Sequence, residues 1–524
     1  MRLPPNAQGQ RGSTVILCVI TITLLAFLAA MTLQKVGAKF HKAYQTAAWQ
    51  EARLAAEAGV DVTMGELSRN AASGASPEIW TGWEHESNGV IGPALSSVLG
   101  LVNSLLSLLG GSGVMSEPIF LDNMNVTTPG GIDSEVDVEL WAIYPNTNVN
   151  KRWFRIRSMA TCAMPPTAYT SPDALDTPLR RYSLHSIRPQ LQKDDVGLPM
   201  NIHTPSASRT VEVLVEPILP FELAIWTAQT LSLATSGTWE VDSYDSRDSQ
   251  KSNPDGTYPG LGSAKVQSNG NIASNRGRTP DSLYGPLISA NGAHVLGGVS
   301  TNGGDDPNTD AHENVSGATA VDPTRIRNDF YREMKPMARP ASGILLPQPI
   351  LGLPFLAGPE LTPTKYLVTG DLNSFQVTPL AQGLKGVVII MVNGDLNLTN
   401  PLTIPPNVTV QLFVRGNIDF HETTVNSDPD SNNLPGQLQI YGEDSGTDAR
   451  TLRADGNASI CAAFYGPTYD VSLSDNVVWY GAVGAHSFEM LGGGTGGFHY
   501  DEALGQVGAP VGFRIVRYVE DVRE

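Results

Sequence analysis

Apolar residues fill one long stretch near the N-terminus. Residues 14–33 read TVILCVITITLLAFLAAMTL, and no charged residue falls between Gly12 and Gln34. About 20 apolar residues in a helix span the ~30 Å hydrocarbon core of a bilayer. The alternative is a cleaved signal peptide with a small-residue site at residues 36–38, but its apolar region normally has only about 7–15 residues. The length therefore favours a retained transmembrane anchor, in contact with the lipid bilayer over residues 13–33.

The helical pattern continues beyond this stretch to about residue 70. Residues 34–70 are rich in Ala, Gln and Glu, which favour helix, although Gly59 and Gly65 weaken the far end. Apolar residues recur at spacings that put them on one helical face: Leu33, Val36, Phe40, Ala43, Ala47, Leu54 and Ala58. Two partners remain open for this face, the protein's own next domain or neighbouring copies in a filament.

A change of pattern follows the helix. Residues 71–116 form a Gly/Ser-rich connector, and its apolar stretch Ala94–Leu109 is too short and serine-rich for a second membrane span. Residues 117–217 contain segments of alternating apolar and polar residues, at 135–141, 153–159 and 210–215. Such alternation predicts half-buried strands of a small antiparallel sheet.

Short strands and glycine turns repeat from about residue 218 onward. The sequence Val-x-Gly-Asp/Asn-Leu/Ile recurs with its glycines at Gly370, Gly394 and Gly416. Repeats of this length, each with one or two strands, suggest a β-solenoid in which stacked coils bury one another's apolar faces. A β-sandwich is the main competitor. Proline-rich residues 336–365 separate a first solenoid segment (218–335) from a second (366–505), as a linker or as a strap across the coils.

Composition narrows the class of protein. Charged residues make up 16% of the chain, and 34 basic against 52 acidic residues give a net charge of −18. A chain this acidic has no global electrostatic footprint for nucleic acid. Three cysteines exclude a disulfide-dense scaffold. Cys18 lies in the apolar stretch, while Cys162 and Cys461 could form one disulfide outside the cytoplasm or stay as small buried residues.

The N-terminal residues resemble those of a known family. Residues 10–12 (QRG), the apolar stretch and residues 55–60 (AAEAGV) look like the N-terminal region of the PilX family, minor-pilin-like proteins of type IV pilus assembly. This resemblance implies a leader (1–12), a transmembrane and amphipathic helix (13–70) and a pilin-like sheet domain (117–217). It also implies contacts with other pilin-like subunits through the helix. Cleavage after Gly12 would leave Ser13 first and Leu17 fifth, where type IV pilins generally carry Phe and Glu.

The later segments resemble a second family. Residues 242–247 (DSYDSR), the Gly-Asp-Leu repeats, 465–467 (YGP) and 498–504 (FHYDEAL) look like an uncharacterised repeat domain found behind PilX-type N-termini in bacterial surface proteins. They resemble bactofilin-like solenoids more loosely. The expected fold class is therefore mainly β, with a long N-terminal transmembrane α-helix, a small antiparallel sheet domain, a C-terminal β-solenoid and a C-terminal tail (506–524).

Candidate chemistry lies first at the corners of the repeats. Asp371, Asp395 and Asn417 would stack on successive coils, and stacked oxygen ligands can hold Ca²⁺. The simpler interpretation is structural, because Gly-Asp and Gly-Asn suit tight corners with positive φ. Acidic loops at 242–248, 305–310 and 428–433 match no Ca²⁺-binding pattern. We therefore expect no cofactor, with Ca²⁺ as the one ion that the corners would suit.

Catalytic signatures are missing from the sequence. There is no G-x-S-x-G motif, no P-loop and no H-E-x-x-H pair. His486 and His499 are expected at the surface or in a side-chain ladder. Residues 499–502 (HYDE) are expected to close the last coil rather than to form a hidden site. A run of aromatic residues between Phe464 and Tyr500 fills the core or, if exposed, would suit polysaccharide.

These features predict a single-pass bacterial surface protein that is not an enzyme. The bulk of the chain is expected outside the cytoplasm, although the flanking charges are nearly balanced between Arg2 and Arg11 on one side and three lysines on the other. The expected role is structural or adhesive, linked to a type IV pilus-like assembly. The alternative is a surface-tethered β-helix protein that binds or degrades polysaccharide.

Overall fold

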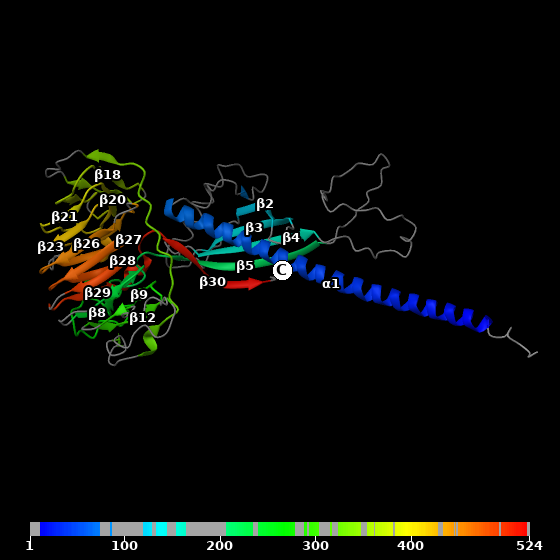
Figure 1. The fold of residues 1–524 in the computed structure, drawn as a ribbon. Coiled ribbons are helices and arrows are strands. Elements are labelled where there is room, and N and C mark those ends of the chain that lie inside the picture. The colour runs from blue at the N-terminus through cyan, green and yellow to red at the C-terminus, as the bar shows by residue number, and fades with distance from the viewer. Residues whose placement is uncertain are drawn as a thin grey trace, which may run out of the picture.

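The computed structural model describes residues 11–73, 84–85, 119–127, 133–143, 153–163, 206–233, 239–277, 288–290, 293–302, 315–316, 323–346, 354–360, 362–380, 383–427, 433–444, 446, 449–491 and 494–520. These residues form one long helix, an antiparallel sheet packed against its distal half, and a domain of stacked, mostly parallel strands (Figure 1). The apolar stretch Ala94–Leu109 lies outside the described residues.

A single helix, α1 (Arg11–Ser73), contains both the apolar stretch and the amphipathic segment, which confirms the helix expected over 13–70. All side chains from Val15 to Tyr44 are exposed, and the apolar part is long enough to cross a membrane by length and composition. The helix therefore projects its first half away from the rest of the chain (Figure 1).

The antiparallel sheet, sheet A, has six strands in the order β1-β2-β3-β4-β5-β30. Their bounds are β1 Glu84–His85, β2 Ile119–Thr127, β3 Asp133–Ile143, β4 Trp153–Ala163, β5 Ser206–Ile218 and β30 Gly512–Glu520. The three segments with alternating sequence lie in β3, β4 and β5, as predicted. Alternate residues of β3, such as Val136 and Val138, are buried against α1.

Small residues of α1 make the contact with sheet A. The buried positions on the helix are Ala48, Ala52, Ala55, Ala56, Gly59, Val60, Thr63 and Leu67. At Gly59 the helix backbone comes so close that a Cβ would collide with Ser158 Oγ and lie 2.9 Å from Val136 Cγ1. The stripe named from the sequence is therefore not the docked face: Phe40 is 72% and Leu54 46% exposed. Hydrophobic periodicity favours large side chains, whereas close helix packing selects small ones.

The second sheet, sheet B, arranges most of its strands in three columns of parallel pairings. The first column contains, in spatial order, β15 Ile344–Leu346, β18 Thr364–Val368, β20 Gly386–Val392, β22 Val408–Val414, β25 Leu438–Gly442, β27 Ser459–Ser474, β28 Val478–Leu491, β6 Ile225–Thr227, β9 Ile272–Ser274, β12 Val299–Thr301 and β14 Ile326–Arg327.

The other columns share the long strands β27 and β28, which bend through all three. The second contains β21 Leu396–Leu398, β23 Ile418–His421, β26 Arg450–Asp455, β27, β28, β7 Leu231–Ser232 and β10 Ile288–Ser289. The third contains β24 Thr424–Val425, β27, β28, β29 Gly497–Asp501, β8 Trp239–Tyr244, β11 Ala293–Leu296 and β13 Val315–Ser316.

Three short strands and three 3-10 turns complete the described elements. β17 (Gly358–Pro359) pairs antiparallel with β20, and β16 (Phe355–Leu356) pairs with β19 (Val377–Thr378) in a separate sheet. The 3-10 turns are η3 Pro323–Arg325, η4 Pro435–Gln437 and η5 Glu502–Gln506. We call residues 219–511 the coil domain, whose parallel columns are consistent with the expected solenoid.

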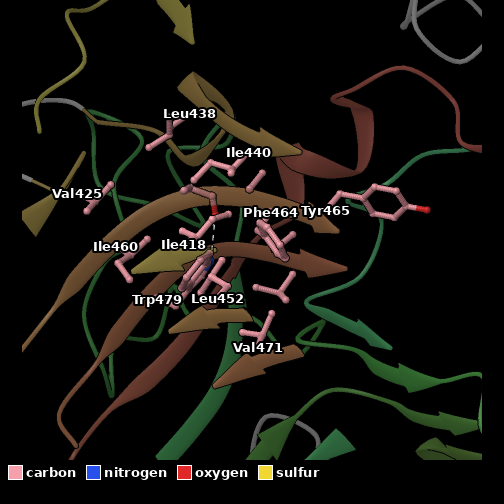
Figure 2. Close-up of a cluster of buried hydrophobic side chains, with 14 of the residues drawn as sticks. Ile418, Val425, Leu438, Ile440, Leu452, Ile460, Phe464, Tyr465, Val471 and Trp479 are labelled. Carbon is pink, nitrogen blue, oxygen red and sulfur yellow. Dashed lines mark hydrogen bonds between the residues drawn. The ribbon is translucent and has the colours of Figure 1, made fainter. Parts of the chain in front are cut away.

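Each column presents a ladder of buried side chains to the interior. In the second column, residues in register from coil to coil are Leu396, Ile418, Leu452, Val471, Phe488, Leu231 and Ile288. Figure 2 shows members of this ladder converging with Ile460 and Trp479 of the third column. Full burial of each large apolar side chain contributes roughly 1.5–3 kcal/mol, and a single coil could not achieve it alone.

The order of coils in space differs from their order in the sequence. The last coil of the chain stacks on the first, because Val483 of β28 is in register with Ile225 of β6 and Phe498 of β29 with Val241 of β8. In Figure 1 the stack therefore runs from β18 through β28 and β29 to β8, β9 and β12. The two segments expected at 218–335 and 366–505 belong to one continuous sheet.

The coil domain is an insertion in sheet A rather than a C-terminal domain, which corrects the expected order of domains. The chain leaves the sheet after β5 and returns in β30, which pairs antiparallel with β5 starting at Gly512 opposite Ile218. The segment 506–524, expected as a tail, thus provides an edge strand. Most side chains of β30 are exposed, so its sequence carries little periodic signal.

Residues 328–343, which we call the strap, run back along the stack from β14 to β15. Arg332 pairs with Glu222 at 2.7 Å, the Tyr465 hydroxyl donates to Lys335 O at 2.9 Å, and Arg339 pairs with Glu443 at 3.1 Å. Part of the expected linker at 336–365 instead forms β-strands, since β15, β16 and β17 lie within it. Extended proline-rich chain crosses the coils without needing backbone pairing.

Candidate functional site

The corner residues named from the sequence form a hydrogen-bonded ladder. Asp371 Oδ1 accepts the backbone N–H of Asp395 at 2.9 Å, and Asp395 Oδ1 accepts that of Asn417 at 2.7 Å. Asn417 Oδ1 in turn accepts the backbone N–H of Thr451 at 3.1 Å. The structure therefore brings all three candidates together, with an oxygen of each bound to the next coil.

The glycines before these residues are needed for close stacking, not for positive φ. Gly394 and Gly416 are absent from the described residues with positive φ, which include Asn407, Asn426 and Asp475 at other turns. A Cβ at Gly394 would collide with Asp371 Oδ1 and lie 2.7 Å from Asp371 N. The expected backbone reason for the glycine is thus wrong, and the steric reason replaces it.

A second cluster lies where the first and last coils meet. The two sequence segments 242–247 and 498–504 are brought together there, because β8 and β29 are neighbours with His499 in register with Asp242. His499 Nδ1 lies 2.7 Å from Asp242 Oδ1, and the Tyr258 hydroxyl donates to Asp242 Oδ2. The Tyr258 ring stacks on the His499 ring with centroids 3.9 Å apart. His499 is therefore buried and engaged, not a surface residue.

The rest of residues 499–502 also join coils. The Tyr500 hydroxyl donates to Phe221 O at 3.0 Å. Asp501, which is almost fully buried, accepts the backbone N–H groups of Ser246 and Ala503, each at 3.0 Å. Burial raises the pKa of Asp501 to about 6. Glu502 accepts hydrogen bonds from Ser243 and Asn269, so these four residues close the last coil onto the first.

After Asp242, the carboxylates of the acidic loop 242–248 bind groups close by in the chain. Asp245 pairs with Arg247 at 2.8 Å, and Asp248 Oδ1 accepts the backbone N–H of Gln250. The Lys265 ammonium donates to Ser249 O at 2.9 Å and to Ser252 O at 2.7 Å. It thus occupies carbonyl oxygens that a metal cation could bind in an open loop. The loop 305–310 and residues 428–432 lie outside the described residues.

Other sequence candidates have structural surroundings. His486 Nδ1 lies 2.9 Å from Asp470 Oδ1 at a half-exposed position. The aromatic run is mostly core: Phe464, Tyr465, Tyr469, Trp479, Phe488, Phe498 and Tyr500 are buried. Trp479 Nε1 donates to Ala462 O inside the cluster of Figure 2. These rings are therefore not available as a flat surface for sugars.

The cysteines do not pair. Cys162 packs in sheet A with Ala48 and Ala52 of the helix, whereas Cys461 lies in the coil domain with its Sγ 3.5 Å from Asn433 O. Both are buried free thiols, which matches the second of the two interpretations of the sequence.

One open depression lies beside the contact between the first and last coils. Its volume is about 310 Å³, and it is lined by Glu222, Asn269, Asn271, Tyr500, Glu502, Gly505 and Gln506. Glu222 and Glu502 already have partners in Arg332 and Ser243. Within the described ranges, no group of three or more His, Cys, Asp or Glu residues is placed to hold a metal ion.

Sequence reasoning missed the Asp242–His499 pair. The two residues are 257 positions apart, and no local spacing links them. The available signal was indirect, since both segments contributed to the same resemblance. The cluster buries polar side chains between the first and last coils and gives them hydrogen-bond partners.

One known family model matches part of this chain. Residues 365–507 match the family model of a domain of unknown function, DUF7305, which covers the second half of the coil domain. No curated protein matches the sequence. Among solved structures, the competence-associated pilin ComZ from Thermus thermophilus aligns over 91% of this chain and 98% of its own, at 10% identity. Its TM-score of 0.28 is too low to establish a common fold.

Proposed function

We propose that this protein is a membrane-anchored bacterial surface protein with a structural or adhesive role, associated with a type IV pilus-like assembly through α1. In this proposal the coil domain is a β-solenoid held away from the membrane by the helix and sheet A. The bulk of the chain lies outside the cytoplasm.

One observation carries the proposal: α1 has two apolar faces, and only one of them is docked. Its small residues, from Ala48 to Leu67, pack on sheet A. Its large apolar residues stay exposed well beyond the membrane-spanning part, at Phe40, Leu54 and Val62. Leaving such surface in water costs roughly 25 cal/mol per Å², so this face favours contact with another helix.

The N-terminal sequence gives independent support. Residues 10–12 and 55–60 resemble the N-terminal region of the PilX family. The members of that family are minor-pilin-like proteins. The second sequence motif lies where α1 docks on sheet A, so it accounts for the small-residue face rather than the exposed one.

We further propose that the protein is not an enzyme and needs no cofactor. The corner acids accept backbone N–H groups, and the His499 cluster is buried under Tyr258. General acid–base catalysis requires groups within hydrogen-bond reach of a substrate atom, and these side chains already reach protein partners. Purified protein screened against a polysaccharide panel should show no turnover. Turnover that disappears in His499→Ala, with the fold retained, would contradict this.

The location is tested by protease accessibility in intact spheroplasts. Added protease should digest the coil domain while a cytoplasmic marker protein stays intact. Protection of the coil domain until the membrane is dissolved would place it in the cytoplasm and contradict the proposal.

The assembly role is tested by site-specific photo-crosslinking in cells. A photoreactive amino acid at Phe40 or Leu54 should yield adducts with a second copy or with another pilin-sized subunit. The same residue at Thr46, exposed on a different side of the helix, is the matched control. Equal adducts at all three positions, or none at Phe40 and Leu54, would show that the exposed face has no specific helical partner.

A further inference from the structure

Three lysines lie on one side of α1 directly after the apolar stretch. Lys35, Lys39 and Lys42 are spaced by four and three residues, which places them on one helical face. All three are exposed. Because α1 is continuous from Arg11 to Ser73, the helix itself fixes their position relative to the apolar stretch.

This part of the helix has no acidic residue near it in the sequence and no packing on sheet A. The first acidic residue of the chain is Glu51, and from Val15 onward the first buried helix residue is Ala48. The three positive charges thus stand together on a chain whose net charge is −18.

The height of the lysines matches the headgroup layer of a bilayer. At 1.5 Å per residue, they lie roughly 3–14 Å beyond Leu33, the last residue of the apolar stretch. The polar layer on each side of the hydrocarbon core is about 5–8 Å thick, and long lysine side chains can reach back toward it.

We propose that Lys35, Lys39 and Lys42 bind the phosphate groups of anionic phospholipids. The helix then recognises the charged headgroups of its membrane as well as the hydrocarbon core. The inference rests on the membrane anchorage in the proposed function, but not on the pilus-like assembly, and it holds for either orientation of the anchor.

The test uses full-length protein reconstituted into phosphatidylcholine vesicles. Trace spin-labelled phosphatidylglycerol or spin-labelled phosphatidylcholine is added, and the motionally restricted lipid fraction is measured by electron spin resonance. Attraction of juxtamembrane lysines to anionic lipid predicts a preference for phosphatidylglycerol on the order of threefold to tenfold. This preference should fall steeply with added salt.

Matched variants assign the preference to these residues. K35Q/K39Q/K42Q should bring the preference to about one, whereas K35R/K39R/K42R, which keeps the charge, should retain it. The control K335Q/K365Q/K385Q removes the same charge from the coil domain and should also retain it. Equal binding of the two lipids by the native protein, or an undiminished preference in K35Q/K39Q/K42Q, would overturn the inference.

Two further outcomes separate this inference from the proposed function. Native protein that does not float with the vesicles would overturn the anchor and the inference together. Protein that floats without lipid preference, while K35Q/K39Q/K42Q loses photo-crosslinks from Phe40 in cells, would overturn the inference alone. That result would mean that the three lysines bind acidic residues of a neighbouring subunit instead of lipid phosphates.

Discussion

At the corners of the coils, single oxygen atoms connect one coil to the next. Asp395 Oδ1 accepts the backbone N–H of Asn417, while its own N–H is accepted by Asp371. A carboxylate and an amide oxygen accept such a bond equally well in geometry. The charge of these acids is therefore not what the fold requires at the corner.

The corner ladder predicts an order of destabilisation among three variants. Asp395→Asn should change the unfolding free energy by less than about 0.5 kcal/mol. Asp395→Ala, which leaves Asn417 N–H without its acceptor, should cost about 1–2 kcal/mol. Gly394→Ala should cost about 1–3 kcal/mol through the clash with Asp371. Chemical denaturation of full-length protein in detergent measures all three.

The control is Asp419→Ala, at an exposed position next to the ladder. It should have little effect. If Asp395→Asn proved as damaging as Asp395→Ala and abolished binding of added Ca²⁺, the ladder would be a metal site.

The buried carboxyl of Asp501 predicts a specific pH dependence. Its pKa is raised from 3.8 to about 6 by burial. The folded state then binds the proton more tightly than the unfolded state, so the contribution of Asp501 to stability is greatest below about pH 4. It is lost as pH rises to about 6 and then stays constant. A shift of about two units corresponds to about 3 kcal/mol as an upper value.

Asp501→Asn should remove this dependence. Asn can still accept the N–H groups of Ser246 and Ala503, and it carries no charge to bury. The variant should match the native protein near pH 4 and exceed its stability increasingly up to about pH 6. Denaturation curves at pH 4, 5, 6 and 7 give the comparison, and a constant difference at all four would refute the assignment.

At the scale of elements, two glycines of α1 differ in their role: the contact with sheet A requires Gly59 but does not require Gly65. Gly59 faces Ser158 and Val136 of sheet A, whereas a Cβ at Gly65 would meet nothing within 4 Å. Gly59→Ala should therefore destabilise docking by about 1–3 kcal/mol. Gly65→Ala should stabilise the helix by up to about 1 kcal/mol.

Hydrogen exchange of the α1 amides between residues 48 and 67 distinguishes the two variants. Faster exchange in Gly59→Ala and slower exchange in Gly65→Ala are expected. Slower exchange in both would mean that the two glycines act only through helix propensity and that the close approach at Gly59 has no energetic role.

Local patterns in the sequence were enough to predict several elements. The extent of α1, the strands around Val136 and Val213, and the stacked corners all follow from residues near one another in the chain. The docked face of α1 could not be predicted, because alanine and glycine carry little hydrophobic signal.

Pairings between distant segments could not be predicted either. Nothing local indicates that β6 stacks on β28 or that β30 returns to β5. The contact of His499 with Asp242 depends on that closure, so the candidate cluster could be named in parts but not assembled.

At the scale of the whole molecule, β30 is the return connection from the coil domain to sheet A. Its Tyr518 hydroxyl donates to Glu57 of α1 at 2.8 Å, and Glu520 pairs with Arg53 at 2.8 Å. Truncation after Val511 should therefore loosen sheet A and leave the coils intact. Hydrogen exchange should rise in β5 and stay unchanged in β27. An equal rise in β27 would show that the two parts unfold as one unit.

The stacking of the last coil on the first has a consequence for the growing chain. Asp242 leaves the ribosome 257 residues before His499. At about 5–20 residues per second, the strands that will meet the last coil stay without their partner for roughly 10–50 seconds of synthesis. During that time β6, β7 and β8 present an unpaired edge, the kind of surface on which aggregation starts. Export of the chain in an unfolded state would keep that edge from forming until the closing strand has also arrived.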